Sequence, residues 1–275
     1  MKNLKEIIAS YSNQNLEQRK NWYSPAAQAY NKTRPHYPQD LIRQVVEIAQ
    51  LSSNSTILEV GCGPATATVA FAQLGCSILS LEPNTDFYQL AQQNCQQYPN
   101  VEIQNTSFEE WMLETEKFDA VLAASSFHWI PMEVGYPKAA KALKKNGYLI
   151  LLWNKELQPR YRVYQRLSEV YQIHAPFLNR YEDRKTQEDI LRGLGQMIID
   201  SGQFKDLVAG NVESEVIYTV DEYLTLLNTY SPYLKLEPQS KEALFTGLRD
   251  RIEHEFGGSL HLSYISAFHI AQKCQ

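Results

Sequence analysis

Two glycines, Gly61 and Gly63, follow a strand-like apolar run that contains the carboxylate Glu59. Glycine allows the backbone to turn sharply and lets a ligand approach the main chain closely. A helix-compatible segment begins directly after the turn, so the N-terminus of a helix is expected beside it. A strand, a glycine turn and a helix N-terminus are together typical of a nucleotide-type site at the carboxyl end of a parallel sheet.

A second carboxylate, Glu82, ends the next strand-like run. An acidic side chain at this place can accept hydrogen bonds from both hydroxyls of a ribose. Thr66 stands where a dinucleotide fingerprint carries a small residue under a pyrophosphate. The pattern therefore favours an adenosine-containing ligand without a pyrophosphate. Two other interpretations remain. The motif could belong to an NAD-dependent oxidoreductase, which fits less well, or it could be a plain tight turn with an incidental glutamate and no ligand.

The run from Ile57 to Gly63, followed by Glu82, resembles motif I and the acidic loop of class I S-adenosylmethionine-dependent methyltransferases. Two further segments are similar to the type-11 and trans-aconitate methyltransferase-like small-molecule enzymes: residues 30–38 and Phe127-His128-Trp129. The resemblance covers residues 24–154 well and the later part only by pattern. It implies an enzyme that uses S-adenosylmethionine as cofactor and methylates a small molecule.

The resemblance also implies which residues contact the cofactor. Glu59 and the two glycines would surround its methionine part, and Glu82 would hold its ribose diol. Ser107 stands where the family places contacts to adenine; no aspartate is present there, so the bond to the adenine amine would come from Ser107 or the backbone. The implied cofactor-binding residues are Tyr30, Arg34, Glu59, Gly61, Cys62, Gly63, Glu82, Pro83, Asn84, Ser107, Phe108, Ala124 and Ser125.

Two of these residues could have a structural role instead of binding the cofactor. Glu59 suits the cationic end of the ligand, but it can also serve only as an acceptor that stabilises the turn. Cys62 is interpreted as a small turn residue and not as a nucleophile.

His128 is the candidate catalytic residue, because it follows the fourth strand at the edge where the acceptor should lie. Methyl transfer aligns nucleophile, methyl and sulfur, and needs a general base only if the acceptor arrives protonated. His128 could be that base, could bond a substrate oxygen, or could simply pack against a backbone carbonyl. Arg34 could pair with a carboxylate, or could belong to a solvated arm that caps the sheet edge.

Strand-like runs at 56–60, 77–81, 101–104, 118–124 and 148–153 alternate with helical patterns at 65–74, 85–97 and 132–144. This alternation predicts a parallel sheet with helices on both faces. Strand-like runs at 207–219 and 261–271 could finish the same sheet. With the resemblance, the fold class is α/β: a Rossmann-like, doubly wound, seven-stranded sheet, mostly parallel with an antiparallel last strand, plus helical insertions over its carboxyl edge.

We expect one domain over residues 1–275. Residues 1–39 would form an arm or lid, residues 40–154 the cofactor-binding core, and residues 155–205 and 220–255 an acceptor-side cap. The cap contains Tyr161, Tyr164, Tyr171, Tyr230 and Tyr233, of which one or more should line the acceptor pocket, although aromatic residues on helices are more often core.

Composition limits the possible partners and compartments. A net charge of −5 argues against nucleic acid or an anionic membrane. No run approaches the roughly 18 apolar residues of a spanning helix, and no signal-peptide core is visible. The four cysteines show no metal or redox spacing, and Gly258 stands where a zinc-protease motif starting at His254 needs its second histidine. We therefore expect a reduced, cytoplasmic protein without a metal.

The expected function is methyl transfer from S-adenosylmethionine to a small-molecule acceptor, at an oxygen or a carboxylate. The alternative is a non-catalytic, S-adenosylmethionine-binding or regulatory protein of the same fold, because cofactor residues alone do not demonstrate catalysis. The acceptor itself and the oligomeric state are left open by the sequence.

Overall fold

The aliphatic runs form the parallel part of a central β-sheet. The computed structural model describes residues 4–274. Five strands pair in the order β3-β2-β1-β4-β5, each parallel to its neighbour. They are β1 (Thr56–Val60), β2 (Ser77–Leu81), β3 (Val101–Gln104), β4 (Phe118–Ala124) and β5 (Leu143–Asn154). The first four match the predicted bounds, whereas β5 begins at Leu143 instead of residue 148, before a shift in its register with β4.

The sheet continues with antiparallel pairing. β8 (Ser259–Lys273) lies between β5 and β7 (Phe204–Thr219) and runs antiparallel to both. The two-residue β6 (Gln158–Pro159) pairs with the beginning of β8. The described residues thus form eight strands instead of seven, and the prediction of a mostly parallel, Rossmann-like sheet with an antiparallel last strand is confirmed.

Alternating side chains build a hydrophobic layer on each face of the sheet. Ile57 and Ile150 pack with α4 and α5, whereas Leu58 and Leu149 pack with α7 and α9. α6 packs beside β3 and α5. The bounds are α4 (Gln39–Ile48), α5 (Thr66–Ala72), α6 (Thr85–Cys95), α7 (Met132–Ala142) and α9 (Arg184–Asp200).

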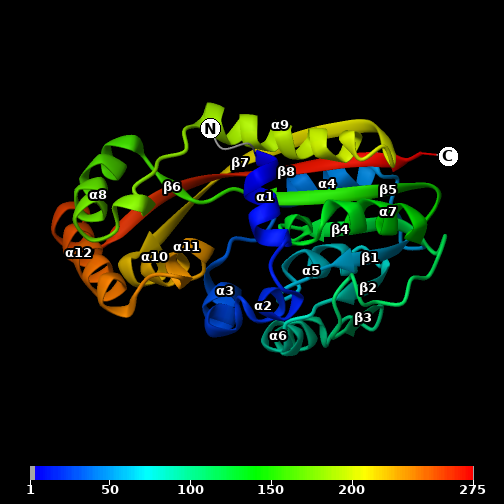
Figure 1. Cartoon of the computed structure of the whole chain (residues 1–275), viewed down its shortest axis with the longest axis horizontal. Coiled ribbons are helices and arrows are strands. Elements are labelled where there is room, and N and C mark those ends of the chain that lie inside the picture. Colours follow the sequence, from blue (N-terminus) through cyan, green and yellow to red (C-terminus); the bar gives the residue numbers. More distant parts are fainter. Residues whose placement is uncertain (1–3, 275) are drawn as a thin grey trace.

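β7 and β8 extend beyond the parallel strands as a long two-stranded ribbon (Figure 1). Further helices pack on this extension around a second hydrophobic core, in which Leu226, Leu244 and Leu248 are fully buried. These helices are α8 (Tyr161–His174), α10 (Val220–Leu227), α11 (Ser231–Leu234) and α12 (Pro238–Phe256). The sheet therefore connects two cores through its antiparallel strands.

The residues before α4 form an arm of short helices: α1 (Leu4–Ser12), α2 (Leu16–Asn21) and α3 (Ala27–Thr33) (Figure 1). Nη1 of Arg19 donates to Oε1 of Glu109 at 2.7 Å and to the carbonyl oxygen of Trp129 at 2.5 Å. The Asn84 side-chain amide donates to the carbonyl oxygen of Lys20 at 2.7 Å. These bonds hold the arm over the carboxyl ends of the parallel strands; residues 1–3 of the predicted arm lie outside the described residues.

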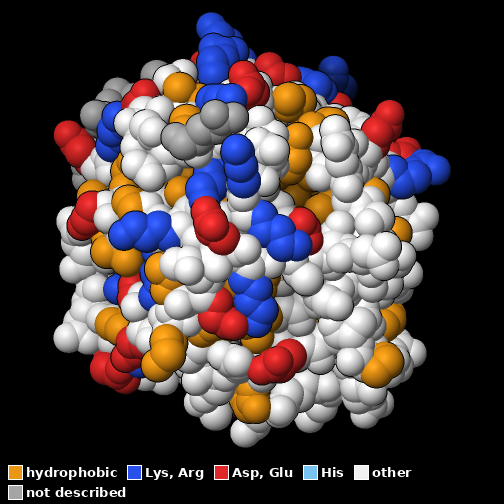
Figure 2. All heavy atoms as spheres, turned by 90° about the vertical axis from the view of Figure 1, so that its right-hand side faces the viewer, with side chains coloured by type: hydrophobic (Ala, Val, Ile, Leu, Met, Phe, Trp, Pro, Cys, Tyr) orange, Lys and Arg blue, Asp and Glu red, His pale blue; other side chains and the backbone are white. Residues whose placement is uncertain are grey.

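The parallel strands begin at the opposite end of the sheet. There Asp119 pairs with Lys144 at 2.9 Å and accepts from the backbone nitrogen of Thr56 at 2.8 Å. Figure 2 shows the face on this side of the molecule, where positive and negative side chains are mixed. Asp119 thus joins the beginning of β1 to the beginning of β5, while the predicted site residues lie at the carboxyl edge.

Candidate active site

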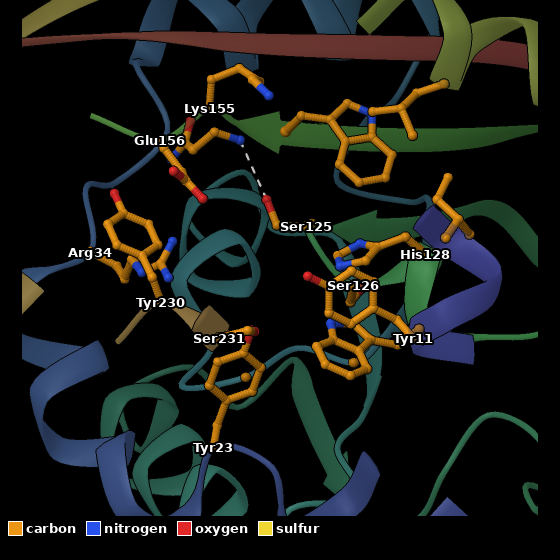
Figure 3. Close-up of a pocket in the computed structure, with 18 of the residues that line it drawn as sticks. Tyr11, Tyr23, Arg34, Ser125, Ser126, His128, Lys155, Glu156, Tyr230 and Ser231 are labelled. Atoms are coloured by element: carbon orange, nitrogen blue, oxygen red, sulfur yellow. Dashed lines mark hydrogen bonds between the residues drawn. The ribbon is translucent and has the colours of Figure 1, made fainter. Parts of the chain in front are cut away.

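A cavity of about 1020 Å³ lies at the carboxyl edge of the parallel strands. The turns after β1, β2, β4 and β5 line it, and the arm, α9 and α11 enclose it. Figure 3 shows Arg34, Tyr230 and Glu156 on one side and Tyr11 and His128 on the other. The structure brings all the predicted site residues except Glu59 to this cavity: Tyr30, Arg34, Gly61, Cys62, Gly63, Glu82, Pro83, Asn84, Ser107, Phe108, Ala124, Ser125 and His128.

The glycine turn after β1 adopts backbone angles that favour glycine. Gly61 has φ +66° and Gly63 has φ +57°. A Cβ on Gly61 would lie 2.8 Å from Cβ of Ser126, so β1 and the loop after β4 approach closely here. A Cβ on Gly63 would meet nothing within 4 Å, although Gly63 lines the cavity. The turn thus leaves open space beside Gly63 in which a ligand can touch the backbone.

Glu82 follows β2 and points its carboxylate at the same turn. Its two oxygens accept from the backbone nitrogens of Gly63 at 2.7 Å and Asn84 at 2.8 Å. Each oxygen keeps further acceptor capacity. Burial raises the pKa of Glu82 to about 7, against the two amide bonds, which lower it. A buried, oriented carboxylate on the cavity wall fits the ribose diol of the adenosine ligand that the sequence predicts.

Glu59 does not line the cavity, which differs from the expected contact with the cofactor. Its carboxylate accepts from Oγ1 of Thr68 at 2.5 Å and from Oγ of Ser80 at 3.2 Å. Burial raises its pKa to about 7, and its Oε1 atom has no hydrogen-bond partner among residues 4–274. These two bonds tie the Glu59 carboxyl group to α5 and β2, on the sheet face of Ile57, so the contacts of this side chain are structural ones beside the turn.

Short local bonds build the side of the cavity that the family resemblance assigns to adenosine. Asn84 caps α6 by accepting from the backbone nitrogen of Phe87 at 2.9 Å. Ser107 is buried, and its carbonyl oxygen accepts from the backbone nitrogen of Trp111 at 2.9 Å, which closes a single turn after β3. Phe108 stacks on Trp111 at 6.2 Å between ring centroids. These contacts fix the wall that the sequence assigns to adenine.

Arg34 is held rigidly between the arm and the cap. Its guanidinium lies over the rings of Tyr30 and Tyr230, at 4.8 and 4.1 Å from their centroids. Nε and Nη2 donate to Oγ1 and the carbonyl oxygen of Thr229, both at 2.8 Å. Nη1 makes no hydrogen bond within residues 4–274, so a donor remains for the cavity that Arg34 lines.

His128 lies across the cavity from Arg34 (Figure 3). The edge of the Tyr11 ring approaches it at 6.1 Å between centroids, and the Trp153 ring lies at 5.9 Å. Burial lowers its pKa to about 4, and the buried Nδ1 atom has no hydrogen-bond partner among the described residues. The packing alternative with a backbone carbonyl partner is therefore not what the structure shows.

Ser125 joins the arm to the ends of β4 and β5. Its Oγ bonds the hydroxyl of Tyr37 at 3.1 Å and accepts from the nitrogen of Asn154 at 3.3 Å. Its φ of +56° is a left-handed conformation that serine rarely adopts. Such strain often marks a functional position.

The structure adds cavity residues that sequence reasoning missed. Tyr11 and Tyr23 come from the arm, and Lys155, Glu156 and Arg180 come from the segments after β5. Lys155 pairs with Glu182 at 2.9 Å, and Arg180 pairs with Glu156 at 3.0 Å. Of the five tyrosines expected near the acceptor, only Tyr230 lines this cavity. The sequence predicts an arm over residues 1–39, and the apolar spacing of α1 is a signal that this helix packs on the core.

Two kinds of feature are not found within the described part of the chain. No cluster of three or more histidine, cysteine or acidic side chains there could hold a metal ion. Between residues 4 and 274, no helix combines the length and apolarity needed to cross a membrane.

Comparison with known proteins points to one reaction class. Residues 58–151 match the family model described as a methyltransferase domain. Two uncharacterized methyltransferases of Schizosaccharomyces pombe are similar over most of their length. One is 24% identical over 82% of this chain and 84% of the relative, and the other is 27% identical over 80% and 81%.

A solved structure shares the fold. The protein, assigned as a type II methyltransferase from Anaeromyxobacter dehalogenans, superposes with a TM-score of 0.66. It is 18% identical in sequence, and the superposition covers 87% of this chain and 97% of that one.

Proposed function

We propose that the methyl acceptor of this chain, which belongs to the class I S-adenosylmethionine-dependent methyltransferases, is a small molecule that offers a carboxylate oxygen. Methyltransferase activity with S-adenosylmethionine follows from the family. The acceptor is our proposal, and it rests on the polar groups of the cavity.

Arg34 is the observation that carries the proposal. It forms no ion pair with any carboxylate in the described residues, and its hydrogen bonds to Thr229 use Nε and Nη2 and leave Nη1 available as a donor. Glu156 lies on the same side of the cavity, but its carboxylate is bonded to Arg180. An enclosed cation that makes no direct ion pair favours an anion, and a guanidinium is suited to a carboxylate. The nearby cations Lys155 and Arg180 are already paired, so Arg34 is the anchor for the acceptor.

We assign His128 to orientation of the acceptor. A histidine whose pKa is about 4 is neutral at pH 7 and removes protons poorly. A neutral imidazole can instead donate one hydrogen bond to an acceptor oxygen. A carboxylate is already ionised at neutral pH, so it needs no base.

When bound, S-adenosylmethionine supplies an electrophilic methyl group on a sulfonium sulfur. Around it, Glu82 would bind the ribose and the glycine turn would contact the methionine part. Arg34 and His128, facing each other across the cavity, would hold the acceptor in one orientation. The arm and α9 would exclude water, so alignment provides much of the rate.

The test is a methyl-transfer assay that detects S-adenosylhomocysteine with a panel of small carboxylates, phenols and amines. We expect turnover with carboxylates and a methyl ester as product. Arg34→Gln should reduce kcat/KM for carboxylates by about a hundredfold, as expected for a lost charged hydrogen bond, while Arg43→Gln on the exposed face of α4 should not.

Circular dichroism on each variant separates lost folding from lost binding. Turnover only with phenols or amines would contradict the carboxylate assignment. Cofactor binding without turnover on any acceptor, including whole metabolite extracts, would favour the non-catalytic alternative.

A further inference from the structure

One wall of the cavity carries aliphatic side chains from two helices, next to the polar α9 residues Lys185, Thr186 and Asp189. Helix α1 turns a stripe at helical spacing toward the cavity, and α9 supplies two aliphatic side chains. We call these residues the α1–α9 trough: Leu4, Ile7, Ile8, Ile190 and Leu194.

The two helices are held together, so the trough is a built feature. A Cβ on Gly193 of α9 would lie 2.6 Å from Cδ2 of Leu4, which shows how closely α1 approaches there. Nζ of Lys5 pairs with Asp200 at 2.8 Å. Ile7 nevertheless remains 42% exposed, although it lines the cavity. Aliphatic surface left in contact with water is a place where an apolar ligand gains affinity.

The trough joins the site at His128. Tyr11, one turn after Ile7 and Ile8, meets His128 edge-on, and Arg34 lies opposite (Figure 3). From Leu4 to Tyr11 the helix rises about 10 Å, at 1.5 Å per residue. An acceptor whose anionic end is held at Arg34 and that extends across the cavity past His128 and Tyr11 therefore meets an aliphatic path toward solvent.

We propose that the acceptor is an amphipathic monocarboxylate, with its anionic head at Arg34 and an aliphatic chain in the α1–α9 trough. The pairing of Lys155 with Glu182 and of Arg180 with Glu156 favours one negative charge over two. This inference rests on the proposed function and adds to it the chemical class of the acceptor.

The experiment measures turnover of straight-chain carboxylates from butanoate to decanoate, below their micelle-forming concentrations. Calorimetry with S-adenosylhomocysteine present measures their binding independently of activity. We expect kcat/KM and affinity to rise about fourfold per methylene until the chain reaches solvent near Ile7. Ile190→Gln should lower the decanoate-to-butanoate ratio of kcat/KM about tenfold.

The matched control is Ile173→Gln on α8, an isoleucine that is 75% exposed and outside the cavity, which should leave that ratio unchanged. Turnover of short carboxylates without any dependence on chain length would overturn the trough and leave the proposed function standing. Binding that strengthens with chain length, without turnover of any carboxylate, would support the trough and contradict the carboxylate as the methylated group. Neither binding nor turnover would overturn both.

Discussion

Glu82 and Glu59 are two buried carboxyl groups near one glycine turn, and their surroundings separate their roles. Glu82 faces the cavity and accepts from backbone amides, whereas Glu59 lies behind the turn and bonds two hydroxyls. Glu82→Ala removes both candidate ribose bonds, so we expect S-adenosylhomocysteine binding to weaken about a hundredfold. Isothermal titration measures this, with Glu102→Ala on the exposed side of β3 as the control. Unchanged affinity in Glu82→Ala would contradict the ribose assignment.

The pKa of Glu82 predicts a pH dependence of cofactor binding. The group is about half protonated at pH 7 in the free protein, and only its ionised form accepts two hydroxyl donors. The dissociation constant for S-adenosylhomocysteine should therefore fall about tenfold between pH 6 and pH 8. In Glu82→Gln this slope should be absent, which separates it from ionisation of the ligand itself.

The pKa of Glu59 makes a prediction about stability. Burial raises this pKa from 4.5 to about 7. The contribution of the neutral Glu59 carboxyl group to the free energy of unfolding is therefore fully present below about pH 4.5 and is lost as the pH rises through 7. Glu59→Gln cannot ionise, so its stability relative to the native protein should improve by on the order of 2–3 kcal/mol between pH 4.5 and pH 8. Urea unfolding at the two pH values measures this; an equal difference at both would contradict the raised pKa.

At the scale of elements, the turn between β1 and α5 contains Gly61 and Gly63, and Gly202 in the turn between α9 and β7 has the same backbone requirement but different surroundings. Gly61, Gly63 and Gly202 all have positive φ, but only Gly61 faces a close neighbour, Ser126. Alanine should cost about 1 kcal/mol through the backbone at each position. Gly61→Ala should cost a further 1–3 kcal/mol through the clash, which denaturant unfolding measures.

Gly63→Ala should match Gly202→Ala in stability and yet lose cofactor affinity, because its methyl group would enter the cavity. Binding calorimetry on these two variants isolates that effect. If Gly63→Ala bound S-adenosylhomocysteine normally, the backbone of the turn would not contact the cofactor.

The elements that sequence predicts well here are those built from local periodicity. The strand, turn and helix from Thr56 to Ala72 follow from spacing alone, and Glu82 follows from the next strand. The position of the Glu59 side chain could also be predicted from the sequence, because side chains alternate along a strand and Glu59 falls on the same face as Ile57. The places of Tyr11 and Arg180 in the cavity could not be predicted. These residues reach the cavity only because the arm and the insertions dock on the core, and no local sequence pattern encodes that docking.

At the scale of the whole molecule, the arm is held on the core by side-chain bonds, of which those of Arg19 reach its first two helices. Arg19 donates to Glu109 and to the carbonyl of Trp129, and its side chain is only 10% exposed. Arg19→Ala should speed amide hydrogen exchange in residues 4–21 about tenfold, because both bonds are lost. The midpoint of global unfolding should change little, since Arg19 belongs to none of the hydrophobic cores. Arg43→Ala, on exposed α4, is the control, and equal exchange in both variants would contradict this role of Arg19.

The antiparallel strand β8 has a consequence for how the molecule assembles during synthesis. It pairs with β5 over residues 266–272 and with β7 along nearly its whole length, and both hydrophobic cores include its side chains. The cofactor half can form its parallel strands early, yet the strand that connects the two halves is translated only after residue 258. Because contacts between distant parts of a chain form slowly, the nascent protein should expose one edge of β5 to chaperones until β8 arrives.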